Sequence, residues 1–396
     1  MFDTPTVFIL GAGASCHYGY PTGEQLVKDV IAKTDWLTSL IDRNQIVSKI
    51  LNTTFIQKEI LPQTTDQHLA WRTFFDLCDG LSRRLRQINP PVIDYFLREN
   101  SDLQAIGKLM IALVMLDAES VYNRQQSPNN NQNHKIIYEN SPFHIEREKA
   151  KSIKLYNFKD DWYRFILYRL TLGCQKSEDI LKNKVTFVTF NYDVSLERML
   201  KESLDVIDFF KSGTTSSIID EFLTENRFLH VYGKIRDNPF NEAEQIDYKS
   251  PTTADGRDQF EKTLIKNEWI KDILEKAYEA SRNLKTISPN KTEQETPEVI
   301  AAREKIESAR DVFILGYGFD ENNSKLLNLQ KSLIIHNNKK ARIYFTNYGD
   351  KQAINKRASK LLFRNLEHFG PNDPYNRPTE YAEKSIRNVY SQVQIN

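Results

Sequence analysis

Cysteines are scarce in this 396-residue chain, which has only Cys16, Cys78 and Cys174, far apart in the sequence. A structural zinc site is commonly built from closely spaced cysteine pairs, so these three cysteines exclude a site of that kind. The seven histidines also show no metal-ligand spacing with one another or with a cysteine. We therefore expect no bound zinc or other metal. Because unpaired cysteines are typical of a reducing compartment, we also expect a cytoplasmic protein.

A charge excess of one sign and long apolar runs are also missing. Lys and Arg number 54 against 53 Asp and Glu, which gives a net charge of +1. Direct binding to nucleic acid needs a concentrated basic surface, so we expect none. The apolar run at residues 109–116 is too short to span a bilayer, and the amino terminus does not resemble a signal peptide. We therefore expect no membrane association.

Five apolar segments, each followed by glycine or polar residues, define the fold that we expect. Near-continuous apolar runs separated by helical stretches are typical of parallel strands that are covered on both faces. We therefore predict an α/β fold with a Rossmann-like, doubly wound, mostly parallel sheet and a ligand at the carboxyl ends of its strands. The segments are residues 6–10, 184–190, 227–232, 311–315 and 341–345.

The long interval between the first two predicted strands indicates a helical insertion. Apolar residues recur there at spacings of three and four, as packed helices require. We expect residues 1–37 and 181–365 to form the sheet core and residues 38–180 a helical module that covers its cleft. Residues 366–396 form a tail that either packs back on its own domain or contacts a partner or another copy. Helices are predicted at residues 71–81, 91–97, 103–122, 161–170 and 260–284.

The first apolar segment runs into a glycine-rich turn with the sequence Gly-Ala-Gly-Ala-Ser at residues 11–15. Gly11 permits a tight turn, Gly13 lets the backbone approach a pyrophosphate, and a following helix would offer unpaired N–H groups. Ser15 can bind a phosphate or be an early residue of that helix. Cys16 stands where a third glycine is usual. The turn therefore predicts a dinucleotide site.

Four islands of sequence occur in an order that resembles the sirtuin superfamily. They are the turn at 11–15 with Gly-Tyr-Pro at 19–21, Thr-Phe-Asn-Tyr-Asp at 189–193, the strand that ends in Gly233, and Gly-Tyr-Gly-Phe at 316–319. More narrowly, the chain is similar to the sirtuin-like NAD-hydrolysing effectors of bacterial antiphage defence. The resemblance implies hydrolysis of NAD+ to nicotinamide and ADP-ribose, and abortive infection by NAD depletion. It also implies restraint by homo-oligomerisation or by a separately encoded partner, an Argonaute-like protein or a ring ATPase.

Two departures from the deacylases of this superfamily favour hydrolysis over protein deacylation. The paired zinc cysteines are missing, and Pro21 is followed by Thr22 rather than by the residues that cover nicotinamide in deacylases. A third departure concerns the family histidine, which directly precedes the glycine at the strand end. Tyr232 has that place here, and His230 lies two residues earlier. Because side chains alternate along a strand, both would share one face, and either can take the histidine's role.

Three polar residues are candidates for the chemistry of cleaving the bond between nicotinamide and ribose. Departure of nicotinamide leaves an oxocarbenium-like ribose, which must be oriented and stabilised. Asn191 can position water or the ribose hydroxyls, Asp193 can hold the carboxamide or the developing charge, and His230 can accept a proton near neutral pH. The alternatives remain that Asn191 or Asp193 caps the helix that follows, and that His230 is a hydrogen-bonded sheet residue.

The remaining candidates follow the last two strands. Gly316 and Gly318 are interpreted as points of close cofactor approach, and Asn347 as a contact to the adenosine ribose or a turn residue. A binding module for NAD or ADP-ribose without turnover is the alternative function, and an NAD-dependent deacylase a weaker one. The activating trigger, and a linear or cyclic product, are left open. The predicted catalytic residues are Asn191, Asp193 and His230; the predicted cofactor-binding residues are Gly11, Ala12, Gly13, Ala14, Ser15, Pro21, Asn191, Tyr232, Gly233, Gly316, Gly318 and Asn347.

Overall fold

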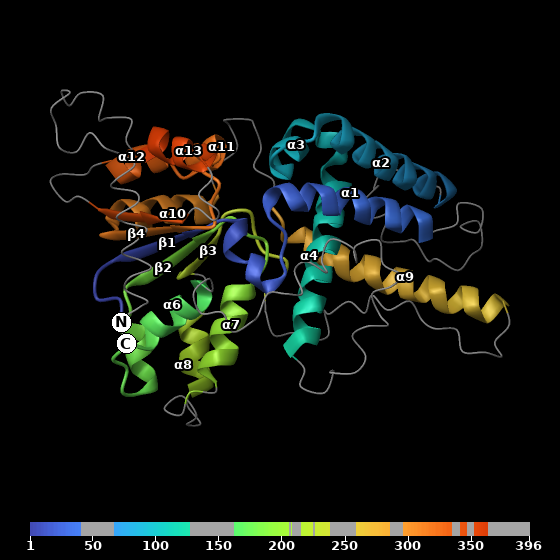
Figure 1. Cartoon of the computed structure of the whole chain (residues 1–396). Helices are drawn as coiled ribbons and strands as arrows, with labels where there is room; N and C mark the ends of the chain where they lie inside the picture. Colours follow the sequence, from blue (N-terminus) through green and yellow to red (C-terminus); the bar gives the residue numbers. More distant parts are fainter. Residues whose placement is uncertain are drawn as a thin grey trace. The chain divides into compact units, whose positions relative to one another are not determined.

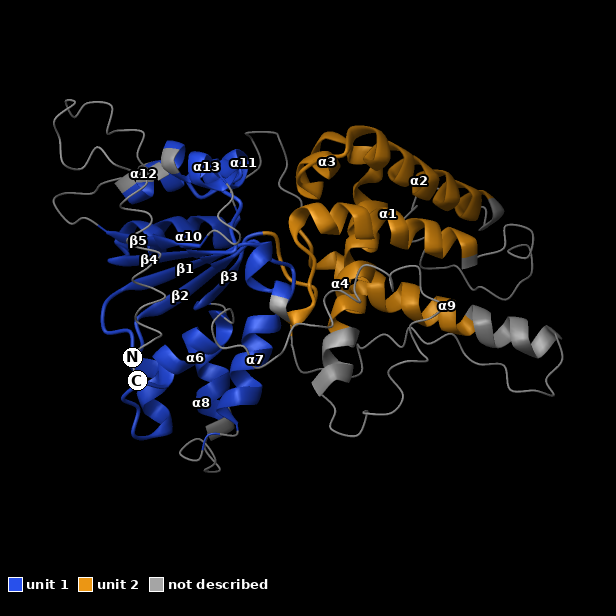
Figure 2. Cartoon of the chain, viewed as in Figure 1, with its two compact units in different colours: residues 1–17, 155–231, 292–396 blue, residues 18–154, 232–291 orange. Residues whose placement is uncertain are grey.

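Two compact units make up the part of the chain that the computed structural model describes (Figure 2). The sheet unit comprises residues 1–17, 155–231 and 292–396, and the helical unit comprises residues 18–154 and 232–291. Neither unit is therefore a continuous stretch of sequence. The structure describes residues 1–40, 67–126, 162–205, 207, 215–224, 226–237, 259–285, 296–334, 341–346 and 352–362.

Five parallel strands form one sheet in the described part of the sheet unit (Figure 1). Their order is β3-β2-β1-β4-β5, so the chain builds outward from β1 to β3 and then returns to the other side of β1. This is the doubly wound arrangement, in which the strand order reverses next to the first strand. The predicted α/β fold with a parallel sheet is therefore confirmed. The strands are β1 (Thr6–Leu10), β2 (Val185–Thr189), β3 (Phe228–His230), β4 (Asp311–Leu315) and β5 (Arg342–Phe345).

Helices cover both faces of this sheet (Figure 1). One face is covered by α6 (Trp162–Thr171), α7 (Ser195–Leu204) and α8 (Thr215–Phe222). The other is covered by α10 (Pro297–Ser308), α11 (Glu321–Leu326), α12 (Leu329–Ile334) and α13 (Gln352–Leu362). Every residue of β1, β2 and β3 is consequently buried, which explains why most of their residues are apolar.

A row of aromatic rings crosses the sheet at a single level. Phe8 of β1 stacks between Phe187 and Phe313, with ring centroids 5.3 and 4.9 Å apart. The row continues at 4.7 Å on each side, to Phe228 of β3 and to Tyr344 of β5. Each such pair contributes about 0.5 to 1.5 kcal/mol beyond burial of its area. Because these rings face one another across paired strands, they help to hold the strands in a register that brings their carboxyl ends to one edge.

The helical unit is built around α4 (Gln104–Gln126), whose residues 109–116 are all buried. Two of the ion pairs in this unit have side chains that are at most 14% exposed: Lys33 Nζ is 3.2 Å from Asp117, and Arg236 Nε is 2.7 Å from Glu119. The helices predicted at residues 71–81, 91–97, 103–122 and 260–284 are confirmed as elements. The remaining helices of the unit are α1 (Gly23–Leu40), α2 (Gln67–Ile88), α3 (Ile93–Glu99) and α9 (Gln259–Arg282).

The boundaries of the units differ from those expected. We expected residues 1–37 in the sheet core and 38–180 in the helical module, but α1 belongs to the helical unit and α6 to the sheet unit. Helix α1 packs on α2 and α4, whereas α6 packs on α7. The expected tail at residues 366–396 lies outside the described residues. That the helical module covers the cleft stays a prediction.

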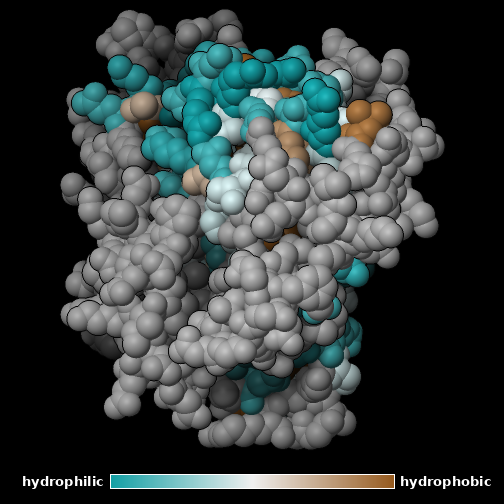
Figure 3. Space-filling view, turned by 90° about the vertical axis from the view of Figure 1, so that its right-hand side faces the viewer, coloured by the Kyte–Doolittle hydropathy of each residue, from teal (hydrophilic) through white to brown (hydrophobic). Residues whose placement is uncertain are grey.

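The hydropathy of the described surface is ordinary for a globular protein. On the face drawn in Figure 3, the described residues are mainly hydrophilic, and hydrophobic residues occur as separate spots. Large exposed hydrophobic residues such as Leu69 and Ile88 occur singly, as is normal for a protein surface. None of the helices within the described ranges combines the length and the apolar character needed to cross a bilayer.

Candidate functional site

The carboxyl edge of the sheet brings together segments that are far apart in the sequence. Leu10 at the end of β1 pairs with Thr189 of β2 and with Leu315 of β4, so these strands end at one level. The side chain of Asn191, just after β2, donates a hydrogen bond from Nδ2 to Ser15 Oγ at 3.2 Å. The amino-terminal glycine turn and Asn191 therefore lie together at this edge of the sheet.

The glycines after β1 and β4 allow two turns of backbone to pack against each other. The N–H of Gly11 donates to Leu315 O at 2.9 Å, and the N–H of Gly13 donates to Gly316 O at 3.0 Å. A Cβ on Gly11 would lie 2.6 Å from Gly316 O, and one on Gly13 would lie 2.9 Å from Gly316 Cα. These two N–H groups are thus already hydrogen-bonded to main-chain oxygens of the protein. The packing against Gly316 by itself accounts for both glycines, and the approach of a pyrophosphate to this backbone stays a prediction.

The turn after β1 is not followed at once by an α-helix. Ala12–Ala14 and Cys16–Tyr18 form two short 3-10 helices, and α1 begins only at Gly23, in the helical unit. Pro21 also belongs to the helical unit. The α-helix expected after the turn is therefore present, but two 3-10 helices and residues 19–22 separate it from Gly13. Ser15 is buried and bonds to Asn191, so it stays a candidate site residue.

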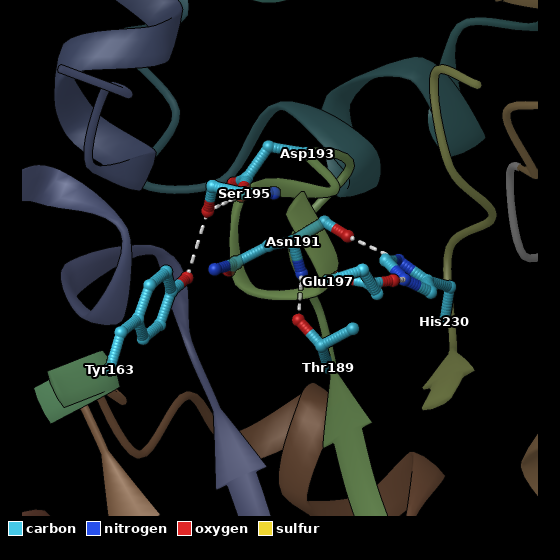
Figure 4. A network of polar contacts seen from close by, with 7 residues as sticks. All are labelled: Tyr163, Thr189, Asn191, Asp193, Ser195, Glu197 and His230. Carbon is cyan, nitrogen blue, oxygen red and sulfur yellow. Dashed lines mark hydrogen bonds and ion pairs between the residues drawn. The ribbon is translucent and has the colours of Figure 1, made fainter. Parts of the chain in front are cut away.

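Asn191 is the residue on which the candidate site depends. It is 6% exposed, and its own N–H donates to Thr189 Oγ1 at 3.0 Å. Figure 4 shows that its side-chain amide and its main-chain carbonyl point in opposite directions. The side-chain oxygen, Oδ1, is buried and has no hydrogen-bond partner in the described part of the chain. An unsatisfied buried acceptor costs about 1 to 3 kcal/mol, so a water or ligand donor is the expected partner.

Asp193 is buried beside Asn191 and is bonded to the start of α7. Its Oδ1 accepts hydrogen bonds from the N–H of Ser195, at 3.1 Å, and from the Ser195 hydroxyl. The Ser195 hydroxyl also lies 2.9 Å from the phenol oxygen of Tyr163 (Figure 4). Burial raises the pKa of Asp193, while hydrogen bonds from Ser195 and Ser15 oppose that rise. Asp193 therefore satisfies the first N–H of α7, as the capping alternative expected.

His230 has both ring nitrogens in hydrogen bonds within the protein. Its Nδ1 lies 3.1 Å from the main-chain oxygen of Asn191, and its Nε2 lies 2.7 Å from Oε1 of Glu197 (Figure 4). A general base needs a nitrogen lone pair that faces the proton to be removed. This geometry favours a residue that holds Asn191 over one that takes a proton from water.

Glu197 is a site residue that the sequence reasoning missed. It lies in the first turn of α7, and its side chain is only 10% exposed. A signal was available in the helical spacing, because Leu200 and Leu204 follow Glu197 at three and seven residues and are both buried. An acidic residue on the apolar face of a helix requires a buried partner. That partner is His230.

The expectation that Tyr232 shares a strand face with His230 is wrong. Strand β3 ends at His230, and Tyr232 and Gly233 belong to the helical unit. There Tyr232 O accepts a hydrogen bond from the N–H of Lys285 at 2.9 Å, and Gly233 forms an isolated bridge with Leu284. Gly233 has a φ of 74°, and a Cβ would collide with Asn283 O, so this position requires glycine.

The two glycines after β4 have different surroundings. A Cβ on Gly316 would overlap Ala14 N, and its φ is 59°, so Gly316 is needed for the packing of the two turns. A Cβ on Gly318 would meet no atom within 4 Å. Gly318 is therefore the glycine of this turn beside which the described protein leaves space for a ligand.

Hydrogen bonds also hold the segment that follows Gly318. Asp320 Oδ1 accepts from the N–H groups of Asn322 and Asn323, at 3.0 Å each, and so caps α11. Thr346 Oγ1 accepts from the N–H of Gly316 at 2.9 Å and joins the end of β5 to this turn. Asn347, the predicted ribose contact, lies outside the described residues.

No three His, Cys, Asp or Glu side chains within the described ranges gather as a metal ion would require. Comparison of the chain with protein-family models, with curated proteins and with solved structures found no match. The function is therefore inferred from the geometry of the site, together with the order of the sequence motifs.

Proposed function

We propose that this chain is an NAD+ glycohydrolase, which uses water to cleave NAD+ into nicotinamide and ADP-ribose. The observation that supports the proposal most is the buried Oδ1 of Asn191, which is held beside Ser15 at the carboxyl edge of the sheet and has no hydrogen-bond partner among the described residues. Doubly wound parallel sheets bind nucleotides at this edge, near the point where the strand order reverses. The open space beside Gly318 supports the same assignment.

The proposed chemistry needs orientation and charge stabilisation more than it needs an acid. Nicotinamide departs as a neutral molecule, and the barrier lies in forming an oxocarbenium-like ribose. Asn191 Oδ1 would accept a hydrogen bond from the attacking water or from a ribose hydroxyl and so orient it. Asp193, when ionised, would stabilise the positive charge that develops on the ribose.

An unrestrained enzyme of this kind would exhaust the NAD+ of its cell. We therefore propose that hydrolysis is restrained in a homo-oligomer, or by a separately encoded Argonaute-like or ring-ATPase partner. The resemblance to sirtuin-like defence effectors supports phage infection as the trigger and NAD depletion as the outcome. The chain has no Walker phosphate loop of its own, so an ATPase activity would belong to the partner.

The test is to incubate the purified full-length protein with NAD+, alone and with the products of neighbouring genes, and to separate nicotinamide from ADP-ribose by chromatography. We expect Asn191→Ala to reduce nicotinamide release by about 10²- to 10³-fold, which is typical for loss of one orienting polar group. Asn322→Ala is the matched control, because Asn322 is exposed and its side chain has no part in the proposed site. Nicotinamide release that Asn191→Ala leaves unchanged would refute the proposed site.

The engagement of both ring nitrogens of His230 favours a second candidate function, a module that binds NAD+ or ADP-ribose without turnover. Such a module has no use for a free base. It would bind ADP-ribose and NAD+, and each would raise the melting temperature of the protein. A rise in melting temperature with NAD+ and ADP-ribose, combined with no nicotinamide release in the presence or absence of partners, would favour the binding module over the hydrolase.

A further inference from the structure

We propose that Glu197 and His230 form a positioning pair that holds Asn191, and that His230 acts as a hydrogen-bond donor rather than as a base. The kinetic part of this inference rests on the proposed NAD+ hydrolysis. Its structural part concerns the position of a proton on the imidazole ring and can be measured without turnover.

Three separate elements contribute to the arrangement. His230 ends β3, Glu197 lies in α7, and Asn191 lies in the segment between β2 and α7. The side chains of His230 and Glu197 are 6% and 10% exposed, so bulk water competes little for their hydrogen bonds. The pair therefore joins the edge strand β3 to the segment that presents Asn191.

The hydrogen-bond partners determine where the protons lie. A main-chain carbonyl can only accept a hydrogen bond, so Nδ1 of His230 must donate its proton to Asn191 O. A second proton then lies between Nε2 and Glu197 Oε1. Whether that proton is on the imidazole or on the carboxyl group, the pair has no net charge, as its burial requires. No ring nitrogen is left to accept a proton from a substrate or a water.

Fixing the Asn191 carbonyl also fixes the side chain that points the other way. The N–H of Asn191 is held by Thr189 Oγ1, its O by His230, and its Nδ2 by Ser15 Oγ. Together these contacts direct Oδ1, the atom without a partner, to one place. Holding reacting groups in a preset orientation is a large part of catalysis. Loss of the pair should therefore lower kcat more than it changes KM.

Three variants separate positioning from proton transfer in the full-length protein with NAD+. Glu197→Gln keeps a hydrogen bond to Nε2, so we expect kcat within about fivefold of the unmodified protein. Glu197→Ala leaves Nε2 unpaired, and we expect kcat to fall about 10- to 100-fold with little change in KM. Glu202→Ala, on the same helix, is the matched control, because Glu202 bonds only to Arg198 at the surface and kcat should not change.

If His230 were a base oriented by a carboxylate, the charge of Glu197 would be essential. Glu197→Gln would then be as inactive as Glu197→Ala, and that result would overturn the proposal. Circular dichroism of each variant shows whether it folds. Where Glu197→Ala does not fold, the rate of Glu197→Gln decides by itself. A Glu197→Gln rate near that of the unmodified protein supports positioning, and loss of activity in Glu197→Gln refutes it.

The proton itself can be observed with ¹⁵N-labelled histidine in the full-length protein. Long-range ¹H–¹⁵N spectra distinguish protonated from unprotonated ring nitrogens, and His230→Gln identifies the His230 signals by their loss. We expect Nδ1 to be protonated in the unmodified protein and in Glu197→Gln. An unprotonated Nδ1 would refute the proposed positioning pair. Absence of NAD+ cleavage by the unmodified protein, both alone and with the products of neighbouring genes, would refute the proposed function and leave this measurement valid, so the two failures can be told apart.

Discussion

Replacing Gly316 by alanine tests the packing of the two turns at the carboxyl edge. The added Cβ would lie 2.7 Å from Gly13 Cα and would overlap Ala14 N and Gly13 C, all of which are main-chain atoms. Main chain cannot rotate away as a flexible side chain can. The hydrogen bond from Gly13 N–H to Gly316 O, which is 3.0 Å long, would also be disturbed.

Two contributions set the expected loss of stability for Gly316→Ala. The φ of 59° places this residue in the left-handed region, where a residue with a Cβ costs about 1 to 2 kcal/mol. Forcing an extra carbon into a closely packed site costs about 1 to 3 kcal/mol more. The free energy of unfolding should therefore fall by about 2 to 5 kcal/mol, a large part of the stability of an ordinary domain.

The assay is urea unfolding followed by circular dichroism, with Gly318→Ala as the matched control. Gly318 lies two residues away in the same turn, but its φ is not positive and a Cβ there meets no atom within 4 Å. We expect Gly318→Ala to change stability by less than about 0.5 kcal/mol. If Gly316→Ala and Gly318→Ala unfold at the same urea concentration, the close approach of the two turns is refuted.

Two further predictions concern buried and half-buried charges. Burial raises the pKa of Asp193 in the folded protein above its unfolded value of 3.8. Protonated Asp193 therefore contributes fully to the free energy of unfolding below pH 3.8, and this contribution is lost as the pH rises through the pKa of the folded protein. Asp193→Asn, which does not titrate at this position, should therefore gain stability relative to the unmodified protein as the pH rises above 3.8, as measured by urea unfolding. A stability difference that does not change with pH would contradict this. Arg342 donates two hydrogen bonds, of 2.6 and 2.7 Å, to Asp311. Because Arg342 is largely exposed, Asp311→Asn should cost only about 1 kcal/mol, and less in 1 M salt; an unchanged urea midpoint at low salt would show that the pair contributes nothing.

The strands could be predicted because their signal is local. The segments at residues 6–10 and 311–315 each contain a run of four apolar residues, as is typical of a strand that is buried on both faces. The predicted bounds match β1 and β4, and they extend beyond β2 and β3 by one or two residues at each end. Parallel strands place their carboxyl ends at one edge of the sheet. The contact between Asn191, which follows β2, and the glycine turn that follows β1 is therefore a consequence of the fold class.

The roles of the glycines and of Tyr232 could not be predicted in the same way. Gly11 and Gly13 are needed because Gly316, about 300 residues later, lies against them. Nothing within residues 11–15 distinguishes a glycine required by another turn from one required by a phosphate. Tyr232 leaves the strand because Gly233 and Leu284 form a bridge, which is again a contact between distant segments.

The sequence by itself determined the α/β class, the parallel strands, most of the helices and the candidacy of Asn191, because composition and periodicity are properties of neighbouring residues. Only the tertiary structure decided that Glu197 pairs with His230, that α1 joins the helical unit, and that Asn191 Oδ1 is buried with no hydrogen-bond partner in the part of the chain that the structure describes. These features depend on which side chains meet after packing. Hydrogen bonds between residues brought together in that way leave almost no trace in the local order of the chain.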